Sequence, residues 1–295
     1  MNATTWADIS AGITGACGSP FAIESRTPVA GGCINQCYRV AGSGRAYFVK
    51  VNSSERRAMF EAEAAGLAEI AATATTRVPA PLCTGANAEA AWLVVEHIEF
   101  GEATTRSMAQ LGEALAAQHR VTARKFGWTT NNTIGATPQL NTQYADWLEF
   151  WRECRLGYQL DLAARNGAPG ALLRKGERLA GGFAALFADR CVKPALLHGD
   201  LWGGNAGFDR TGTPVLFDPA VYYGDREADL AMTELFGGFS ADFYAAYNAA
   251  SPLEAGYEVR KQLYNLYHVL NHFNLFGGGY AAQAQTLVDR LLAEI

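Results

Sequence analysis

The pattern of apolar and polar positions changes about one third of the way along the chain. The first hundred residues contain short apolar or alternating runs separated by glycine-rich turns, which is typical of an antiparallel sheet. The predicted strands span residues 24–30, 36–40, 45–51 and 91–96. Between them, residues 54–70 show apolar positions at helical spacing, with Ser54 placed to cap the first turn. A shorter helix is predicted at 9–16.

After Gly101 the periodicity becomes mainly helical. Helices are predicted at 104–122, 142–166, 171–190, 227–250, 256–276 and 281–294, with short strands at 195–198 and 214–217. A strand-rich segment followed by a helical one predicts an α+β protein with two lobes. We expect a small antiparallel-sheet lobe with one helix over residues 1–98, and a larger, mainly helical lobe over residues 99–295.

Composition narrows the classes of protein that fit this pattern. Hydrophobic residues make up 49% of the 295 positions and charged residues 18%, which favours a large folded core. A net charge of −5, with scattered basic residues, argues against a nucleic-acid partner. No apolar run is long enough to cross a membrane, and the first residues lack the features of a signal peptide, so a cytoplasmic location is expected. The six cysteines are dispersed without a C-x-x-C pair, which favours reduced thiols over a zinc site.

One segment carries a specific chemical pattern, His198-Gly-Asp200-Leu-Trp202-Gly-Gly-Asn205. An Asp five residues before an Asn is the spacing of a kinase catalytic loop, and Asp218 follows a later apolar run where kinases place a metal-binding Asp. Asp200 can orient a substrate hydroxyl and take its proton. Asn205 and Asp218 offer the oxygen ligands that Mg²⁺ prefers. His198 is interpreted as a residue that braces the loop.

The strand-rich lobe contains the residues that an ATP site needs. Lys50 ends a predicted strand, where kinases carry the Lys that binds nucleotide phosphates and pairs with a helix Glu. The helix that follows offers Glu61 and Glu63. We favour Glu63, since it lies beside the buried stripe of that helix, although either residue alone could be an ordinary surface charge.

Two further segments are expected to contact ATP through backbone groups. The first is a glycine-containing turn between two predicted strands, whose N–H groups could cradle phosphates: Gly31, Gly32, Cys33, Ile34 and Asn35. The second is the expected connection between the lobes, where backbone groups would bind adenine: Glu96, His97 and Ile98.

A competing pattern places His268 and His272 four residues apart on one helix. This spacing suits a metal pair, but Val follows His268 where a zinc protease helix has Glu, and no third ligand is evident. Histidines that pack in the core or face a substrate are the favoured interpretation.

With these residues in place, the chain resembles the fructosamine kinase (ketosamine-3-kinase) family nearly from end to end. The resemblance rests on these segments: 31–38, 48–50, 59–63, 132–135, 138–141, 197–205, 217–220, 222–239 and 263–272. It implies a bilobal protein-kinase-like fold, related to those of aminoglycoside phosphotransferases and choline kinases.

The resemblance also implies a reaction. ATP with Mg²⁺ would phosphorylate the 3-hydroxyl of a sugar-derived ketoamine, on a small amine or a protein lysine, and the adduct would then break down and release the amine. Lys50 and Glu63 would anchor ATP, Asp200 would be the base, and Asn205 and Asp218 would hold Mg²⁺. Asp229 would brace the catalytic loop, and Trp202 and His272 are candidate substrate residues.

Two alternative functions and one question about Cys33 stay open from the sequence. The chain could be an aminoglycoside- or choline-type phosphotransferase, or a nucleotide-binding scaffold without activity. Cys33 in the expected phosphate loop could be a small turn residue or a redox-sensitive thiol, so the protein is expected to be a monomer or a redox-dependent homodimer.

Overall fold

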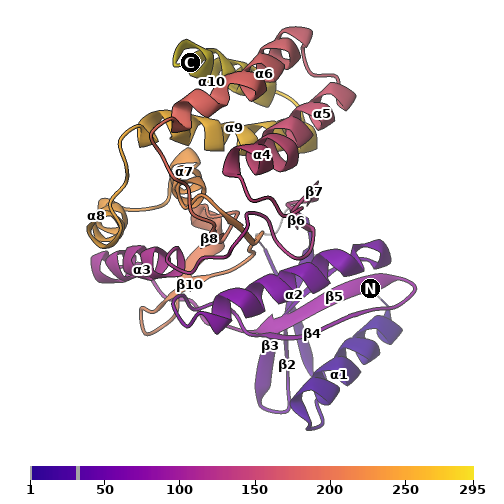
Figure 1. Cartoon of the computed structure of the whole chain (residues 1–295). Helices are drawn as coiled ribbons and strands as arrows, with labels where there is room; N and C mark the ends of the chain where they lie inside the picture. Colours follow the sequence, from indigo (N-terminus) through magenta and orange to yellow (C-terminus); the bar gives the residue numbers. More distant parts are fainter. Residues whose placement is uncertain (1, 31–33) are drawn as a thin grey trace. The chain divides into compact units, whose positions relative to one another are not determined.

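A computed structural model describes residues 2–30 and 34–295 (Figure 1). The chain forms two compact units. The sheet unit comprises Met1–Ser107 with Ala206–Pro219, and the helical unit comprises Met108–Asn205 with Ala220–Ile295. The sheet unit therefore includes a segment from late in the chain. The lobe limits expected from the sequence, 1–98 and 99–295, stay a prediction.

A five-stranded antiparallel sheet forms the centre of the sheet unit. Its strand order is β1-β2-β3-β5-β4. The bounds are β1 Ser25–Val29, β2 Gln36–Gly42, β3 Arg45–Ser53, β4 Pro81–Ala86 and β5 Ala90–Glu96. β3 lies in the middle and pairs Lys50 with Cys37 on β2 and with Leu93 on β5. A lysine on the central strand of a sheet has buried neighbours on both sides, which is unusual for an unpaired charge.

Two helices pack on this sheet, α1 (Ala3–Cys17) and α2 (Arg57–Ala72). α1 buries Trp6, Ile9 and Ile13 against one face of the sheet, together with Val49 and Val51 of β3. Because successive strand residues point to opposite faces, Lys50 points to the other face, where α2 supplies its partner. α1 begins at Ala3, earlier than the predicted residue 9, because the Asn2 side chain accepts a hydrogen bond from the Thr5 N–H and caps the helix.

A short hairpin from the later segment completes the sheet unit. Its strands are β9 (Ala206–Phe208) and β10 (Pro214–Leu216). The Asp209 side chain accepts hydrogen bonds from Thr211 N and Thr213 N inside the turn, and it also pairs with Arg77. Arg77 in turn donates to Glu96 Oε1 at 2.8 Å. These bonds attach the hairpin, and Asp218 just beyond it, to the end of β5.

The helical unit is built around α9 (Tyr257–Phe276), in which every residue from Leu263 to Asn271 is buried. α5, α7 and α10 pack on it. The other helices are α3 Thr105–Gln118, α4 Trp147–Trp151, α5 Gly157–Arg165, α6 Gly170–Gly182, α7 Glu227–Leu235, α8 Ala241–Ala250 and α10 Tyr280–Ala293. Short strand pairs join them: β6 Asn132–Ile134 with β7 Thr137–Gln139, and β8 Ala195–Leu197 with β11 Tyr222–Gly224. The predicted α+β class, with an antiparallel sheet followed by a helical part, is confirmed.

Two predicted helices are interrupted in the structure. The helix predicted over 227–250 is two helices, because Gly237 and Gly238 adopt positive φ angles of 75° and 102° that a helix cannot contain. The helix predicted over 142–166 begins only at Trp147 and contains a π-helical segment, Arg152–Leu156. The predictions also missed β4, since its sequence lacks clear alternation.

No helix of the part of the chain that the structure describes has the length and apolar character that a bilayer crossing requires.

His268 on α9 gives a test of this packing. Burial, with help from nearby His272 and Arg155, lowers the pKa of His268 to about 3, well below the value of about 6.5 in an unfolded chain. Between these values the unfolded state binds a proton that the folded state lacks, so the free energy of unfolding falls as pH is lowered, by up to about 1.4 kcal/mol per pH unit.

We therefore expect His268→Phe to flatten the dependence of stability on pH between 6.5 and 4. Denaturant unfolding of the variant and the native protein across this range measures the two slopes. Equal slopes would show that His268 does not titrate as its burial requires.

Candidate active site

Lys50 lies between two carboxylates in the sheet unit. Its Nζ donates to Glu63 Oε1 at 2.6 Å and also pairs with Asp218. The Lys50 side chain is 6% exposed, and Glu63 is nearly as buried, whereas the Asp218 side chain is 46% exposed. Glu61, the alternative on α2, pairs instead with Arg57 on the surface. The structure thus agrees with the choice of Glu63 as the partner of Lys50.

Charge decides the protonation of this lysine. Burial alone lowers the pKa of the Lys50 ammonium, but the charges of Asp218 and Glu63 outweigh burial and leave that pKa above its ordinary value. Lys50 is therefore a fixed positive charge at physiological pH. Such a group can hold an anionic ligand if one of the two carboxylates releases it, and the more exposed Asp218 is the one that can turn to solvent.

The backbone at Asp218 has an unusual conformation. Its φ angle is 58°, in the left-handed region that residues with a side chain rarely occupy. Such conformations are concentrated at functional sites, where the surrounding structure holds them in place. Here the residues before Asp218 are fixed by the β9–β10 hairpin.

The expected phosphate turn is only partly described. Gly31, Gly32 and Cys33 lie outside the described residues, so the expectations placed on them, including the redox role of Cys33, stay predictions. Ile34 is exposed and Asn35 is half-buried. The Asn52 side chain on β3 donates to Ile34 O at 3.0 Å and to Asn35 Oδ1 at 2.8 Å, which ties this end of the turn to the strand that carries Lys50.

The expected adenine segment begins at the end of β5. The Glu96 side chain accepts from Arg77 and from the Ala80 N–H, so it has a structural task. His97 and Ile98 are half-buried, and burial lowers the pKa of His97.

The catalytic-loop pattern forms a compact turn in the helical unit. Asn205 Nδ2 donates to the Asp200 carbonyl oxygen at 2.8 Å and lies 3.3 Å from Asp200 Oδ2. Gly199 has a φ of 83°, and a Cβ at this position would lie 2.0 Å from Ala220 O. Only glycine fits between His198 and Asp200 here, which explains the Gly of this motif.

Asp229 on α7 holds this loop by its backbone. The His198 N–H donates to Asp229 Oδ2 at 2.7 Å, and the Gly199 N–H donates to Oδ1 at 2.8 Å. His119, the residue directly after α3, donates its Nε2 hydrogen to Oδ2 at 3.1 Å. Burial alone raises the pKa of Asp229, but these donors and the nearby His198 ring bring that pKa below its ordinary value. The expected bracing by Asp229 thus has a direct geometric basis, and His198 takes part through its N–H.

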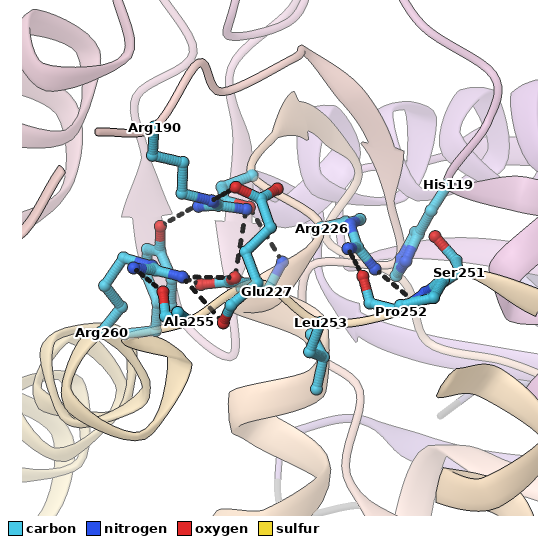
Figure 2. Close-up of polar contacts among 12 residues, drawn as sticks. His119, Arg190, Arg226, Glu227, Ser251, Pro252, Leu253, Ala255 and Arg260 are labelled. Carbon is cyan, nitrogen blue, oxygen red and sulfur yellow. Dashed lines mark hydrogen bonds and ion pairs between the residues drawn. The ribbon is translucent and has the colours of Figure 1, made fainter. Parts of the chain in front are cut away.

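A buried ionic cluster fixes the start of α7 (Figure 2). Arg260 binds Glu227 through two bonds of 2.8 and 2.9 Å, and Arg190 reaches the same Glu227 at 3.2 Å and also pairs with Asp225. Tyr264 donates its hydroxyl to Asp225 as well. Sequence reasoning assigned no role to these residues, although the density of charge in residues 225–229 was a visible signal. The cluster holds α7, and so Asp229, in position.

A chain of buried side-chain amides supports the other side of the loop. Gln139 Nε2 donates to Ala220 O at 3.0 Å and to Asn132 Oδ1 at 2.8 Å, and Asn132 Nδ2 donates to Val221 O. The Ala220 N–H donates to the carbonyl of His198 at 2.8 Å. Asn132 and Gln139 belong to the segments 132–135 and 138–141, which were part of the family resemblance but had no physical role assigned from the sequence.

Arg155 anchors this amide chain from the π-helical segment. It is fully buried, donates to Asn141 Oδ1 at 2.8 Å, and lies 4.0 Å from the ring centroid of Tyr222. Asn141 in turn donates to Asn132. The aromatic face and the carbonyl acceptors stabilise this guanidinium in the interior.

Trp202 and His272 both lie in the helical unit, joined through Phe236. The ring centroids of Trp202 and Phe236 are 6.5 Å apart, and those of Phe236 and His272 are 5.0 Å apart. His272 Nδ1 donates to His268 O at 2.8 Å, which leaves Nε2 as the ring nitrogen available to a ligand. The four-residue spacing therefore lets the His268 carbonyl orient the His272 ring, and this spacing needs no metal to explain it.

Comparison with known proteins identifies the family. The sequence model described as fructosamine kinase matches residues 5–294. The chain belongs to the fructosamine kinase family. It is 50% identical to a probable ketoamine kinase of Synechocystis, over 97% of both chains, and 45% identical to the chloroplastic protein-ribulosamine 3-kinase of Arabidopsis thaliana, over 90% of this chain and 81% of that one.

Solved structures support the same family. A Haemophilus somnus protein assigned to the fructosamine-3-kinases superposes with a TM-score of 0.88 at 29% identity, over 96% of both chains. An aminoglycoside phosphotransferase in complex with ADP and hygromycin B superposes with a TM-score of 0.63 at 17% identity, over 97% of this chain and 98% of that one, which shows a shared fold. The resemblance read from the sequence is confirmed.

The two residues expected to bind Mg²⁺ carry suitable donor atoms for a member of this family. Asn205 uses Nδ2 in the loop, which leaves Oδ1 as the atom for a metal. Asp218 presents a carboxylate that is nearly half exposed. Hard oxygen ligands of this kind, completed by water and phosphate oxygens, are typical of Mg²⁺ sites.

Asp229→Asn tests the bracing of the loop. An amide has one acceptor oxygen where the carboxylate has two, so one of the two backbone N–H groups loses its partner. We expect a loss of about 1.5–3 kcal/mol in the free energy of unfolding, and faster hydrogen exchange of the residue 198 and 199 amides.

The matched control is Asp289→Asn, which removes a surface carboxylate paired with Lys175 and should change stability by less than about 1 kcal/mol. Equal effects of the two substitutions on the exchange of these amides would contradict the bracing role.

Proposed function

We propose that this fructosamine kinase transfers the γ-phosphoryl group of ATP to the 3-hydroxyl of a sugar-derived ketoamine. The observation that carries the proposal is the loop of residues 198–205, in which Asn205 binds Asp200 and buried Asp229 accepts the backbone N–H groups of His198 and Gly199. The family match over nearly the whole chain and the names of the close relatives support the ketoamine as acceptor.

In this proposal the sheet unit binds the nucleotide. Lys50 binds phosphate oxygens, and Glu63 keeps the Lys50 ammonium in place. The 2.6 Å hydrogen bond from Lys50 Nζ to Glu63 Oε1 supports this assignment. Backbone N–H groups of the segment 31–35, which the sequence predicts as a phosphate-binding turn, would contact the phosphates, and backbone groups of Glu96, His97 and Ile98 would bind adenine. A buried lysine with a permanent carboxylate partner is well suited to bind phosphate, because its side chain needs little reordering.

The helical unit performs the chemistry. Asp200 accepts a hydrogen bond from the substrate 3-hydroxyl, orients it, and takes its proton as the bond to phosphorus forms. Asp229 holds the backbone of the two preceding residues, so Asp200 is positioned before the substrate arrives. His198 contributes its backbone and braces the loop.

Asn205 and Asp218 are proposed to hold Mg²⁺ through Asn205 Oδ1 and the Asp218 carboxylate. The ion would supply charge neutralisation on the phosphates. Asp218 pairs with Lys50 in this structure, and the proposal requires Asp218 to release the Lys50 ammonium to phosphate when nucleotide binds.

The product explains the biological use of the reaction. A 3-phosphate beside the ketone of the ketoamine is a good leaving group, so the phosphorylated adduct breaks down and releases the amine. The protein would thereby reverse glycation of small amines or of protein lysines. Relatives in Arabidopsis and rice are named protein-ribulosamine 3-kinases, so ribulosamines are the first substrates to test.

Trp202 and His272 are proposed substrate contacts.

The sequence further suggests a cytoplasmic protein that is a monomer, or a homodimer formed on oxidation of Cys33.

The pairing on α2 gives the first test of this proposal. Glu63→Gln removes the charge that holds Lys50, so kcat/KM for ATP should fall by about 10–100-fold. Glu61→Gln is the matched control, two residues away on the same helix and paired only with surface Arg57, and it should change kcat/KM by less than twofold. Comparable losses in both variants would contradict the assignment of Glu63.

Asp200→Asn gives the second test. Ribulosyl-lysine and fructosyl-lysine are offered with ATP and Mg²⁺, beside kanamycin and choline, and phosphate transfer is followed by mass spectrometry. The native protein should phosphorylate the ketoamines, and Asp200→Asn should lower kcat by about 10²–10⁴-fold, because the general base is lost.

Phosphorylation of kanamycin or choline alone would mean a different acceptor on the same fold. ATP binding without transfer to any acceptor would instead indicate a binding protein.

A further inference from the structure

Three aromatic residues of the helical unit are each followed directly by two glycines. They occur as Trp202-Gly203-Gly204, Phe236-Gly237-Gly238 and Phe276-Gly277-Gly278. The three segments are far apart in the sequence: the first lies within the catalytic loop, the second follows α7, and the third begins at the last residue of α9. The structure brings their aromatic rings together around His272.

The rings form a continuous series, here called the aromatic platform: Trp202, Phe236, His272, Phe276 and Tyr280. The ring of His272 lies 5.0 Å from Phe236, 5.7 Å from Phe276 and 5.1 Å from Tyr280, measured between ring centroids. Trp202 extends the series by its edge-to-face contact with Phe236. Distances of this size are those of attractive aromatic pairs.

The rings of the aromatic platform are exposed to solvent, unlike the aromatic side chains in the core of the same unit. Trp202 is 39% exposed, Phe236 43% and Phe276 60%, whereas Phe243 and Tyr264 of the same unit are fully buried. A cluster of exposed aromatic rings on a monomer commonly marks a place where a ligand binds.

Glycines fix the geometry of this surface. A Cβ on Gly204 would lie 2.2 Å from the Trp202 ring, so the ring lies directly over that glycine. A Cβ on Gly238 would lie 3.0 Å from the Gly203 Cα, so the backbone after Phe236 packs closely on the catalytic loop. Larger residues at these positions would separate the platform from the loop that carries Asp200. The platform is therefore built against the reacting end of the unit.

We propose that Phe236 and Phe276 form the subsite for the amine-derived part of the ketoamine, the group that remains when the sugar is removed. This inference rests on the proposed function. The platform begins at Trp202, two residues after Asp200, and continues along exposed rings away from the catalytic loop. This arrangement suits a substrate whose sugar lies at the catalytic loop and whose carrier amine projects outward. Aromatic faces bind apolar and aromatic groups, and also the alkylammonium of a protonated ketoamine.

The expected substrate class is a ketoamine with an aromatic or long alkyl amine, in preference to one with a minimal amine. Two synthetic ketoamines with the same sugar separate the two parts of the substrate: 1-deoxy-1-benzylamino-ribulose and 1-deoxy-1-methylamino-ribulose. The native protein should show the lower KM for the benzyl compound.

Phe236→Ala and Phe276→Ala should each raise the KM for the benzyl compound by roughly tenfold. In Phe276→Ala, the KM for the methyl compound, the KM for ATP and kcat should stay within about twofold. Phe276→Tyr keeps the ring and should keep the preference. Ile295→Ala, which shortens another exposed apolar side chain of the unit, is the matched control and should have no effect on either KM.

Equal changes for both compounds, or no change for either, would overturn the inference. Equilibrium binding of the two compounds to Asp200→Asn protein gives the same comparison without turnover. If the native protein phosphorylates neither compound, the proposed function fails. In that case the inference stands only if the binding measurement shows a preference for the benzyl compound and Phe276→Ala removes that preference.

Discussion

The proposed chemistry depends on the hydrogen bonds that the buried carboxylate of Asp229 accepts. The carboxylate accepts the N–H groups of His198 and Gly199 and a bond from His119, in a place with almost no access to water. A charge in such a place is stable only if it is fully hydrogen-bonded. The protein satisfies it with the backbone of the catalytic loop, so the loop is held by a group that cannot leave its partners without a large loss of free energy. The hydrogen bonds that stabilise the buried Asp229 carboxylate therefore also fix the position of Asp200.

The surrounding structure maintains this arrangement from two directions. The ionic cluster of Arg190, Glu227 and Arg260 holds the start of α7, and the amide chain from Arg155 through Asn132 and Gln139 holds Ala220, which binds the carbonyl of His198. Buried polar networks of this kind need every member to be paired. They contribute little net stability compared with apolar packing, but they permit one arrangement of the loop.

The sheet unit shows a different use of charge. Lys50 is buried on the central strand, and it is stable there because two carboxylates face it. One of them, Glu63, is itself buried and permanent, whereas Asp218 is exposed and has a strained backbone. This asymmetry gives the lysine one fixed partner and one that can be exchanged for phosphate. The aromatic platform of the helical unit adds a surface beside the catalytic loop, where the same fold can select the carrier amine.

The sequence by itself determined the fold class and the family, and it predicted the site residues, because these follow from local signals. Periodicity marks strands and helices, and the spacing of Asp200, Asn205 and Asp218 is set by one short loop and one hairpin. The interruptions at Gly237–Gly238 and at the π-helical segment were missed, since an apolar pattern continues across them. Tertiary structure alone decided that Asp225 and Glu227 meet arginines from distant segments, and that three aromatic–glycine–glycine segments share one surface. Such contacts join residues far apart in the chain, and no local pattern records which of them will meet.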